Sequence, residues 1–209
     1  MISFPESTRV HRRMPKDAFY KHLQLTTALK DKFVSDVDSI FMEWSLTKDN
    51  LNLEKDGEVK EILVLHIDLK KQEFDAKIIE AIARQNPHKL VFVMSFEDKR
   101  QLAIYHSKLY RTDWIQEEKV VLSAKGFSLD DIWESLIEQV ALTEEKEPEP
   151  ELSIDDRLER QERIEKLQNQ IEKTEALAWK EQQPKKKFEI FNKLQELKKE
   201  LEDVQNGKA

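Results

Sequence analysis

Two strand-like patterns stand out in the first part of the chain. Every second residue of 40–46 is apolar, which predicts a strand with one apolar face. Residues 90–96, LVFVMSF, are almost continuously apolar and predict a central strand buried on both faces. Residues 60–70 predict another clear strand, and residues 102–106 and 119–123 are expected to add two more. The first part of the chain is therefore expected to contain a sheet.

Helical spacing separates these strands. Apolar residues recur at steps of three and four in residues 16–34, 73–84 and 128–142. Pro15 suits the start of the first of these helices, because its fixed backbone angle matches a helical first turn. The predicted order is α-β-β-α-β-β-β-α. This order indicates an α+β domain over residues 1–143, with a mixed sheet flanked by helices.

The last third of the chain has a different pattern. Residues 144–152 are acidic and contain two prolines, so they predict a linker. Heptad spacing within residues 153–206 predicts an antiparallel helical hairpin or short coiled coil, with a helix interrupted or started at Pro184. The pattern leaves open whether its apolar seam packs within the hairpin, against a second copy or against another protein. The candidate partner-binding residues of this seam are Ile190, Leu194, Leu197 and Leu201.

Composition excludes several classes of protein. The net charge is −7, which argues against non-specific coating of nucleic acid by the whole surface. There is no cysteine, so disulfide and thiolate chemistry are excluded. The three glycines lie far apart, which excludes the glycine-rich phosphate loops of P-loop and Rossmann proteins. No apolar run suggests a membrane span or a secretory signal, and we expect a cytoplasmic protein.

The strand LVLHIDLK contains one candidate for catalysis. Asp68 and Lys70 share a face of the predicted strand, as the carboxylate and lysine of PD-(D/E)xK nucleases do. In such a site the carboxylate binds Mg²⁺ and the lysine helps to activate water. Glu43 is a candidate second carboxylate, although Asp49 and Asp56 are also available. The alternative interpretation is a solvated strand end, and the histidines have no metal-binding spacing, so we expect no cofactor unless the nuclease hypothesis holds.

Two basic segments are candidates for phosphate contact. The N-terminal segment STRVHRRMPK carries Arg9, Arg12, Arg13 and Lys16, which predicts a nucleic-acid-binding arm. Residues 185–187 are three consecutive lysines at the expected turn of the hairpin and form a weaker candidate. The alternative for both segments is a solvated surface. The four tryptophans are expected to lie in the core or in the helical seam.

Several landmarks in succession resemble one bacterial family. They are PESTRVHRRMPKDAFY, LKDKFVSDVDSI, VKEILVLHIDLK, NPHKLVFVM, YRTDW, FSLDDIWESLIEQV and KFEIFNKLQELKKELE. This succession is similar to the family catalogued as domain of unknown function 4391, over essentially the whole chain. The resemblance implies a gene setting beside helicases, DNA methyltransferases and restriction subunits of anti-phage loci. It implies no catalytic residues.

Three functions follow as hypotheses. The first is a non-catalytic adaptor of a DNA-processing or anti-phage system, which binds a helicase, a methyltransferase or a restriction subunit, with DNA as a further ligand. A heptad seam beside an acidic linker favours this interpretation, and the hairpin is also expected to permit self-association. The second is a Mg²⁺-dependent nuclease that uses Asp68, Lys70 and Glu43. The third is a small DNA-binding module that uses Arg9, Arg12 and Arg13.

Overall fold

The structure is a computed structural model that describes residues 2–143 and 152–206. The chain divides into two compact units, residues 1–144 and residues 145–209. The first combines helices with a sheet and is called the α+β unit, and the second is a pair of helices called the hairpin. Most of the predicted linker lies outside the described residues.

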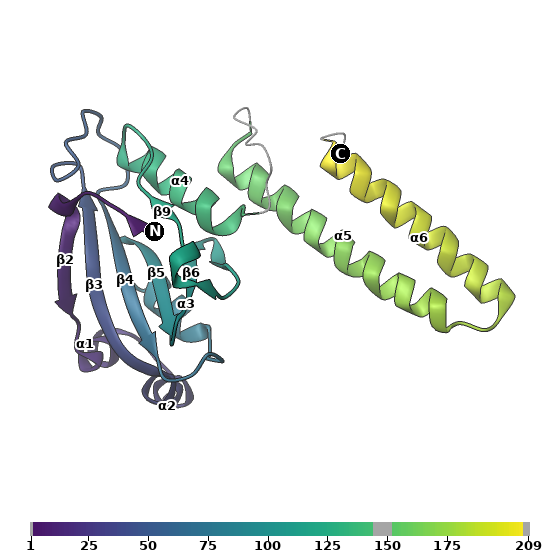
Figure 1. The fold of residues 1–209 in the computed structure, drawn as a ribbon, viewed down its shortest axis with the longest axis horizontal. Coiled ribbons are helices and arrows are strands. Elements are labelled where there is room, and N and C mark those ends of the chain that lie inside the picture. The colour runs from purple at the N-terminus through teal and green to yellow at the C-terminus, as the bar shows by residue number, and fades with distance from the viewer. Residues whose placement is uncertain (1, 144–151, 207–209) are drawn as a thin grey trace. The chain divides into compact units, whose positions relative to one another are not determined.

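A seven-stranded mixed sheet forms the centre of the α+β unit (Figure 1). Strands β4 and β5 are parallel, whereas the other neighbours along the main path are antiparallel. Helix α3 (Lys77–Arg84) makes the crossover that a parallel pair requires. The path runs β2-β3-β4-β5-β6-β7, with bounds Arg9–Arg13, Val37–Thr47, Glu61–Leu69, Lys89–Phe96, Lys99–His106 and Lys108–Arg111.

Short elements complete the unit. Strand β1 (Ile2–Ser3) pairs in parallel with β9 (Leu122–Ser123), and β8 (Ile115–Gln116) pairs with β6. Two single turns of 3-10 helix lie at Glu6–Thr8 and Glu117–Lys119. These elements lie beside the main path and leave its order unchanged.

Helices α1 (Lys16–His22), α2 (Thr27–Asp36) and α3 pack on one face of the sheet. A fully buried Val, Leu, Ile, Phe or Met side chain stabilises the fold by roughly 1.5–3 kcal/mol relative to leaving it exposed. The core on this face contains Phe19, Phe33, Val37, Ile40, Leu63, Leu65, Ile67, Leu69, Ile78, Ile79, Ile82, Leu90, Phe92, Met94 and Ala103.

Helix α4 (Leu129–Ala141) packs on the opposite face. The helix begins with a capping box, in which Ser128 Oγ accepts the Asp131 N–H and Asp131 accepts the Ser128 N–H. The Lys89 ammonium lies 5.3 Å from the centre of the Trp133 ring, so β5 meets α4 on this side. The alternate sheet residues buried on this face are Leu46, Ile62, Val64, Val91, Val93, Leu102 and Ile104.

The α+β class, the mixed sheet and the packed C-terminal helices confirm the sequence prediction. The order of elements differs from the predicted one. Strands β1, β7 and β8 were not predicted, and the strand expected over residues 119–123 is reduced to β9, because residues 117–119 form a 3-10 turn. Two further differences lie near the start of the chain. Strand β2 precedes the first helix, and the single helix expected over residues 16–34 is the pair α1 and α2. Thr26 causes the second difference, because its side chain accepts the Leu29 N–H at 3.3 Å and starts a new helix.

The hairpin consists of α5 (Ile154–Lys180) and α6 (Pro184–Gln205). Pro184 starts the second helix and does not interrupt one, as its position in the first turn allows. Buried residues recur in each helix at steps of three and four. They are Leu167, Ile171, Thr174 and Ala178 in α5, and Leu194, Leu197 and Val204, with half-buried Leu201 between them, in α6.

Candidate functional site

Asp68 lies at the centre of a polar cluster on the face of the sheet that α4 covers in part. The strand register places Ser39 of β3 and Ser95 of β5 on either side of it. Ser95 Oγ donates to Asp68 Oδ1 at 2.6 Å, and Ser39 Oγ donates to the other carboxylate oxygen. His66 Nε2 lies 3.1 Å from Asp68 Oδ1 and 3.0 Å from Ser95 Oγ. Three strands therefore bring four polar side chains together.

These neighbours keep Asp68 ionised. Burial opposes its charge, but the hydroxyls of Ser39 and Ser95 and the positive character of His66 outweigh burial and lower its pKa. The side chain remains 38% exposed, so solvent reaches the carboxylate. The arrangement is that of an ordered, partly accessible anion whose oxygens already accept hydrogen bonds from two hydroxyls and lie beside an imidazole nitrogen.

The structure does not bring Glu43 to Asp68. Asp68 pairs with Ser39 across the sheet, and Glu43 lies four residues further along the strand of Ser39. Four residues span about 13 Å along a strand. Its carboxylate oxygens instead lie 3.0 Å from Nδ1 of His11. Within residues 2–143 and 152–206, no group of three or more histidine or acidic side chains is placed to hold a metal ion. One carboxylate, one imidazole and two hydroxyls do not fit the oxygen-rich ligand set of Mg²⁺.

Lys70 and Lys16 both lie against the carboxyl end of α2. Lys70 Nζ donates to the Val34 carbonyl at 2.9 Å, and Lys16 Nζ donates to the Val37 carbonyl. Cations at this end of a helix satisfy free carbonyls and complement the helix dipole. The pKa of Lys16 is lowered by burial and then by the positive charge of Lys70. Both ammonium groups therefore contribute to the fold.

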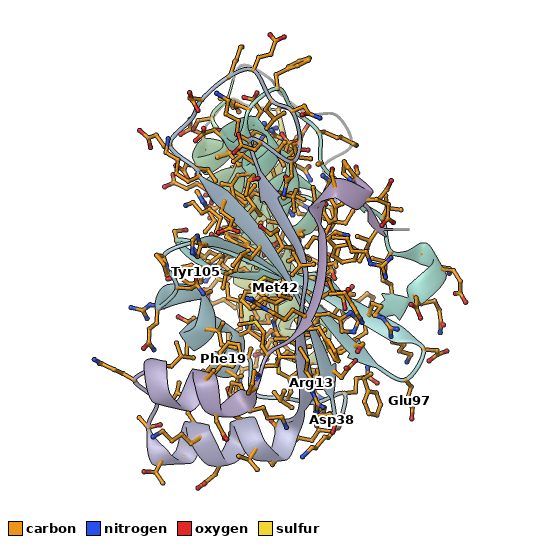
Figure 2. The ribbon with its side chains drawn as sticks, turned by 90° about the vertical axis from the view of Figure 1, so that its left-hand side faces the viewer. Arg13, Phe19, Asp38, Met42, Glu97 and Tyr105 are labelled. Atoms are coloured by element: carbon orange, nitrogen blue, oxygen red, sulfur yellow. The ribbon has the colours of Figure 1, made fainter. Side chains whose placement is uncertain are left out.

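The basic N-terminal segment forms the edge strand β2, which the sequence pattern did not predict because all five of its side chains are exposed. Arg12 and Arg13 are consecutive strand residues, so their side chains point to opposite faces. Nη1 of Arg9 lies 3.8 Å from Oε1 of Glu6. Figure 2 shows Arg13 at the same end of the sheet as Asp38, and both act electrostatically on Lys16. The four predicted residues are therefore neighbours along the chain but do not form one surface.

The predicted partner-binding leucines pack inside the hairpin. Leu194 and Leu197 are buried, and Leu201 packs against the same apolar cluster. Their partners include Leu167 and Ile171 of α5. Ile190, the fourth predicted residue, is half-buried. The seam that the sequence left open is thus closed within the chain, and any external partner has to contact other side chains of the hairpin.

Three aromatic side chains of the hairpin are exposed. Trp179 is 82% exposed, Phe188 67% and Phe191 43%. We call these three residues the tip flank, because they lie near the turn between α5 and α6. The prediction that the tryptophans lie in the core or seam is wrong for Trp179. Trp179 directly follows buried Ala178, and this burial, which the structure reveals, places it outside the seam.

The members of the tip flank lie on the same side of the hairpin. Trp179 directly follows buried Ala178, just as Glu175 and Lys198 directly follow buried residues, and these two form an ion pair at 2.7 Å across the helices. Phe191 and Phe188 precede Lys198 by about two and three turns of α6, so they lie on its side of that helix. Residues that directly precede seam positions lie on the other side, where Arg163 and Glu200 pair at 2.9 Å. Leu177, 59% exposed, belongs to that other side. Leu177 is therefore a matched control for the tip flank.

The lysines at the start of α6 oppose its helix dipole. Helix α5 begins with Asp155 and Asp156, as the dipole favours, whereas the first turn of α6 has no acidic residue and carries three lysines, residues 185–187. Within the described part of the chain, none of the three forms an ion pair. The other end of α6 does have a side chain that complements the dipole. Arg160 donates to the carbonyls of Val204 and Gln205 at 3.1 and 2.6 Å.

Comparison with known families identifies the chain. The model of the family described as "Domain of unknown function (DUF4391)" matches residues 2–201, which include both units. The chain belongs to this family. No curated protein and no solved structure matches it. In the part of the chain that the structure describes, no helix is long and apolar enough to cross a membrane.

Proposed function

We propose that this family member is a non-catalytic accessory protein of a prokaryotic DNA-processing or anti-phage system, with the hairpin as its docking element. The observation that carries the proposal is the tip flank. Trp179, Phe188 and Phe191 are large, apolar and exposed, although the hairpin already has a closed seam of its own. These side chains lie outside the buried cluster of the hairpin, and a binding partner would cover them.

The residue types support docking. Aromatic side chains dominate binding energy at interfaces, because they bury a large area at a small cost in rotamer freedom. Exposed aromatic residues gathered on one side of a small unit mark an interaction surface more clearly than scattered ones do. The partner class follows from the implied gene setting: a helicase, a DNA methyltransferase or a restriction subunit, with DNA as a further ligand.

The direct test is capture of the neighbouring gene products by the tagged full-length protein. A triple variant, with Ala at Trp179, Phe188 and Phe191, is expected to lose capture by roughly thirtyfold or more, as truncation of interface anchors does. Leu177→Ala is the matched control and is expected to capture as much as the wild type. Capture of no neighbour by the wild type, or equal capture by the triple variant, would contradict the proposal.

The nuclease hypothesis keeps one favourable observation. Asp68 lies at the carboxyl end of β4 beside the parallel strand β5, which is where ligands bind in sheets with parallel strands. A cleavage assay with Mg²⁺ or Mn²⁺ on single- and double-stranded DNA separates the two functions. We expect no cleavage by the wild type, and cleavage that Asp68→Ala abolishes would replace the accessory role by a catalytic one.

A further inference from the structure

The tip of the hairpin combines exposed rings with an excess of positive charge. Residues 177–191 contain four lysines and two glutamates, within a chain whose net charge is −7. Three of these lysines lie in the first turn of α6, where the helix dipole is already positive. The tip is therefore a local site of positive potential, and its ligand is expected to be anionic.

A second copy of the chain is a poor ligand for this surface. Two tips brought together would place lysines against lysines beside the aromatic rings. Each chain carries a net charge of −7, so two whole molecules also repel one another at long range. Charge complementarity thus favours a different molecule that carries regular negative charge.

The exposure of the rings favours flat ligand groups. Trp179 and Phe188 are 82% and 67% exposed, so each presents an open ring to solvent. A nucleic-acid base needs no pocket, because it stacks on a single exposed ring. Lysines near such rings contact the phosphates of the same strand.

The spacing of the rings favours a single strand over a duplex. Phe188 and Phe191 are three residues apart in a helix, so their Cβ atoms lie roughly 5–6 Å apart. Bases stacked in a duplex lie about 3.4 Å apart and leave no room for a ring between them. Bases of a single strand can separate and stack on the two rings in turn.

An anionic membrane fits less well. Glu175 lies on the same side of α5, one turn from Trp179, and Glu172 lies one turn further along. The apolar surface is therefore short and is bounded by acidic side chains, whereas interfacial helices present a long apolar face.

We infer that the tip flank and Lys185, Lys186 and Lys187 form a binding site for single-stranded nucleic acid. This inference rests on the proposed function, because it names the ligand of the same docking element. A helicase or restriction complex exposes single strands, and the hairpin would contact such a strand over a few nucleotides.

The test measures binding of labelled oligothymidylate to the full-length protein by fluorescence anisotropy. Trp179→Ala and Phe188→Ala are each expected to weaken binding roughly fivefold to a hundredfold, as loss of one stacking ring does. Leu177→Ala is expected to leave binding unchanged. In a plot of log affinity against log salt concentration, replacing Lys185, Lys186 and Lys187 by Gln is expected to make the negative slope shallower by about 2.

Three results would overturn the inference. One is absence of binding to oligothymidylate, a second is equal binding by Trp179→Ala and the wild type, and a third is equal or tighter binding to a duplex of the same length. Binding to phosphatidylserine vesicles without binding to oligothymidylate would assign the tip to a membrane surface instead.

Capture of neighbouring gene products, repeated after nuclease treatment, separates failure of the inference from failure of the proposed function. If nuclease treatment abolishes the capture, the result supports both the inference and the proposed function. Capture that survives nuclease and is lost in Trp179→Ala, without oligothymidylate binding, overturns the inference and leaves the accessory role intact. If the wild type captures no neighbour but binds oligothymidylate through the tip, the accessory role fails and the binding site remains.

Discussion

The α+β unit and the hairpin place lysines at opposite ends of helices. Lys70 meets the carboxyl end of α2, where its ammonium donates to a backbone carbonyl. Lys185, Lys186 and Lys187 lie at the amino end of α6, where the dipole opposes them. The same residue type is thus used for folding in one unit and is left available in the other. Positive charge that the fold does not use is better evidence of a ligand than positive charge alone.

Apolar side chains show the same division within the hairpin. Leu194 and Leu197 are buried between the helices, whereas Phe191, on the same helix, is 43% exposed. The buried leucines explain why the two helices associate. The exposed aromatic side chains contribute little to that association, so a functional role accounts for them better than a structural one.

The largest expected effect lies in the α+β unit, at Asp36. Its side chain is 2% exposed, and its carboxylate accepts from Lys71 Nζ at 2.8 Å, Ser35 Oγ at 2.5 Å and the Asp75 N–H at 3.1 Å. Asp36→Ala removes the shared acceptor of these donors and is expected to lower the free energy of unfolding by about 3 kcal/mol. Urea unfolding measures this change. Asp31→Ala, at an exposed position of the same helix, is the control, and equal losses would contradict the role of Asp36.

A slightly smaller effect is expected at the hairpin seam. Leu194→Ala removes a buried side chain and is expected to lower the free energy of unfolding of the hairpin by about 2.5 kcal/mol. Phe191→Ala, three residues away, is expected to change it by less than about 0.5 kcal/mol. Thermal unfolding followed by circular dichroism checks both values. A large loss for Phe191→Ala would show that the tip flank serves folding, and the comparison would fail.

Sequence periodicity predicted the parts of the fold that bury apolar side chains. The continuous apolar run of β5 and the capped helix α4 are examples, because burial itself produces their patterns. Strand β2 escaped prediction, since an exposed edge strand rich in arginine needs no apolar alternation. The break between α1 and α2 depends on one threonine cap, which the apolar stripe across it conceals.

The candidate site was harder to predict than the fold. Strand alternation alone puts His66 on the same face as Asp68, but Ser39 and Ser95 join them only through strand pairing between segments distant in the chain. Glu43 was chosen by residue type, and the register separates it from Asp68. The heptad pattern found the seam of the hairpin, yet only the buried positions reveal which aromatic residues lie outside it.

An acidic residue at the start of α4 provides the counterpart of the lysines at the start of α6. N–H groups of Phe127 and Ser128 and the Ser128 hydroxyl lower the pKa of Asp131 below its usual value of 3.8. A lowered folded pKa stabilises the protein above pH 3.8, and this contribution is lost as pH falls through the folded pKa. Asp131→Asn is therefore expected to cost about 1 kcal/mol at neutral pH.

The pH dependence of this variant gives the decisive measurement. In urea unfolding at a series of pH values, the difference between Asp131→Asn and the wild type should close in acid, below the ordinary pKa of an aspartate. A difference that persists there would mean that the asparagine disturbs the cap by its shape, and not by the missing charge.

The smallest expected effect is the most informative about the tip. Replacing Lys185, Lys186 and Lys187 by Gln removes three charges that oppose the α6 dipole, and should raise the free energy of unfolding by about 0.5 kcal/mol at low salt. Lys70→Gln should lower it by a similar amount, because a carbonyl at the end of α2 loses its donor.

Lys193→Gln, in the middle of α6, controls for lysine removal alone. Urea unfolding at low and high salt checks the signs, since salt should shrink the gain of the triple variant. If the triple variant is instead less stable than the wild type, the lysines serve folding, and the division between the two units disappears.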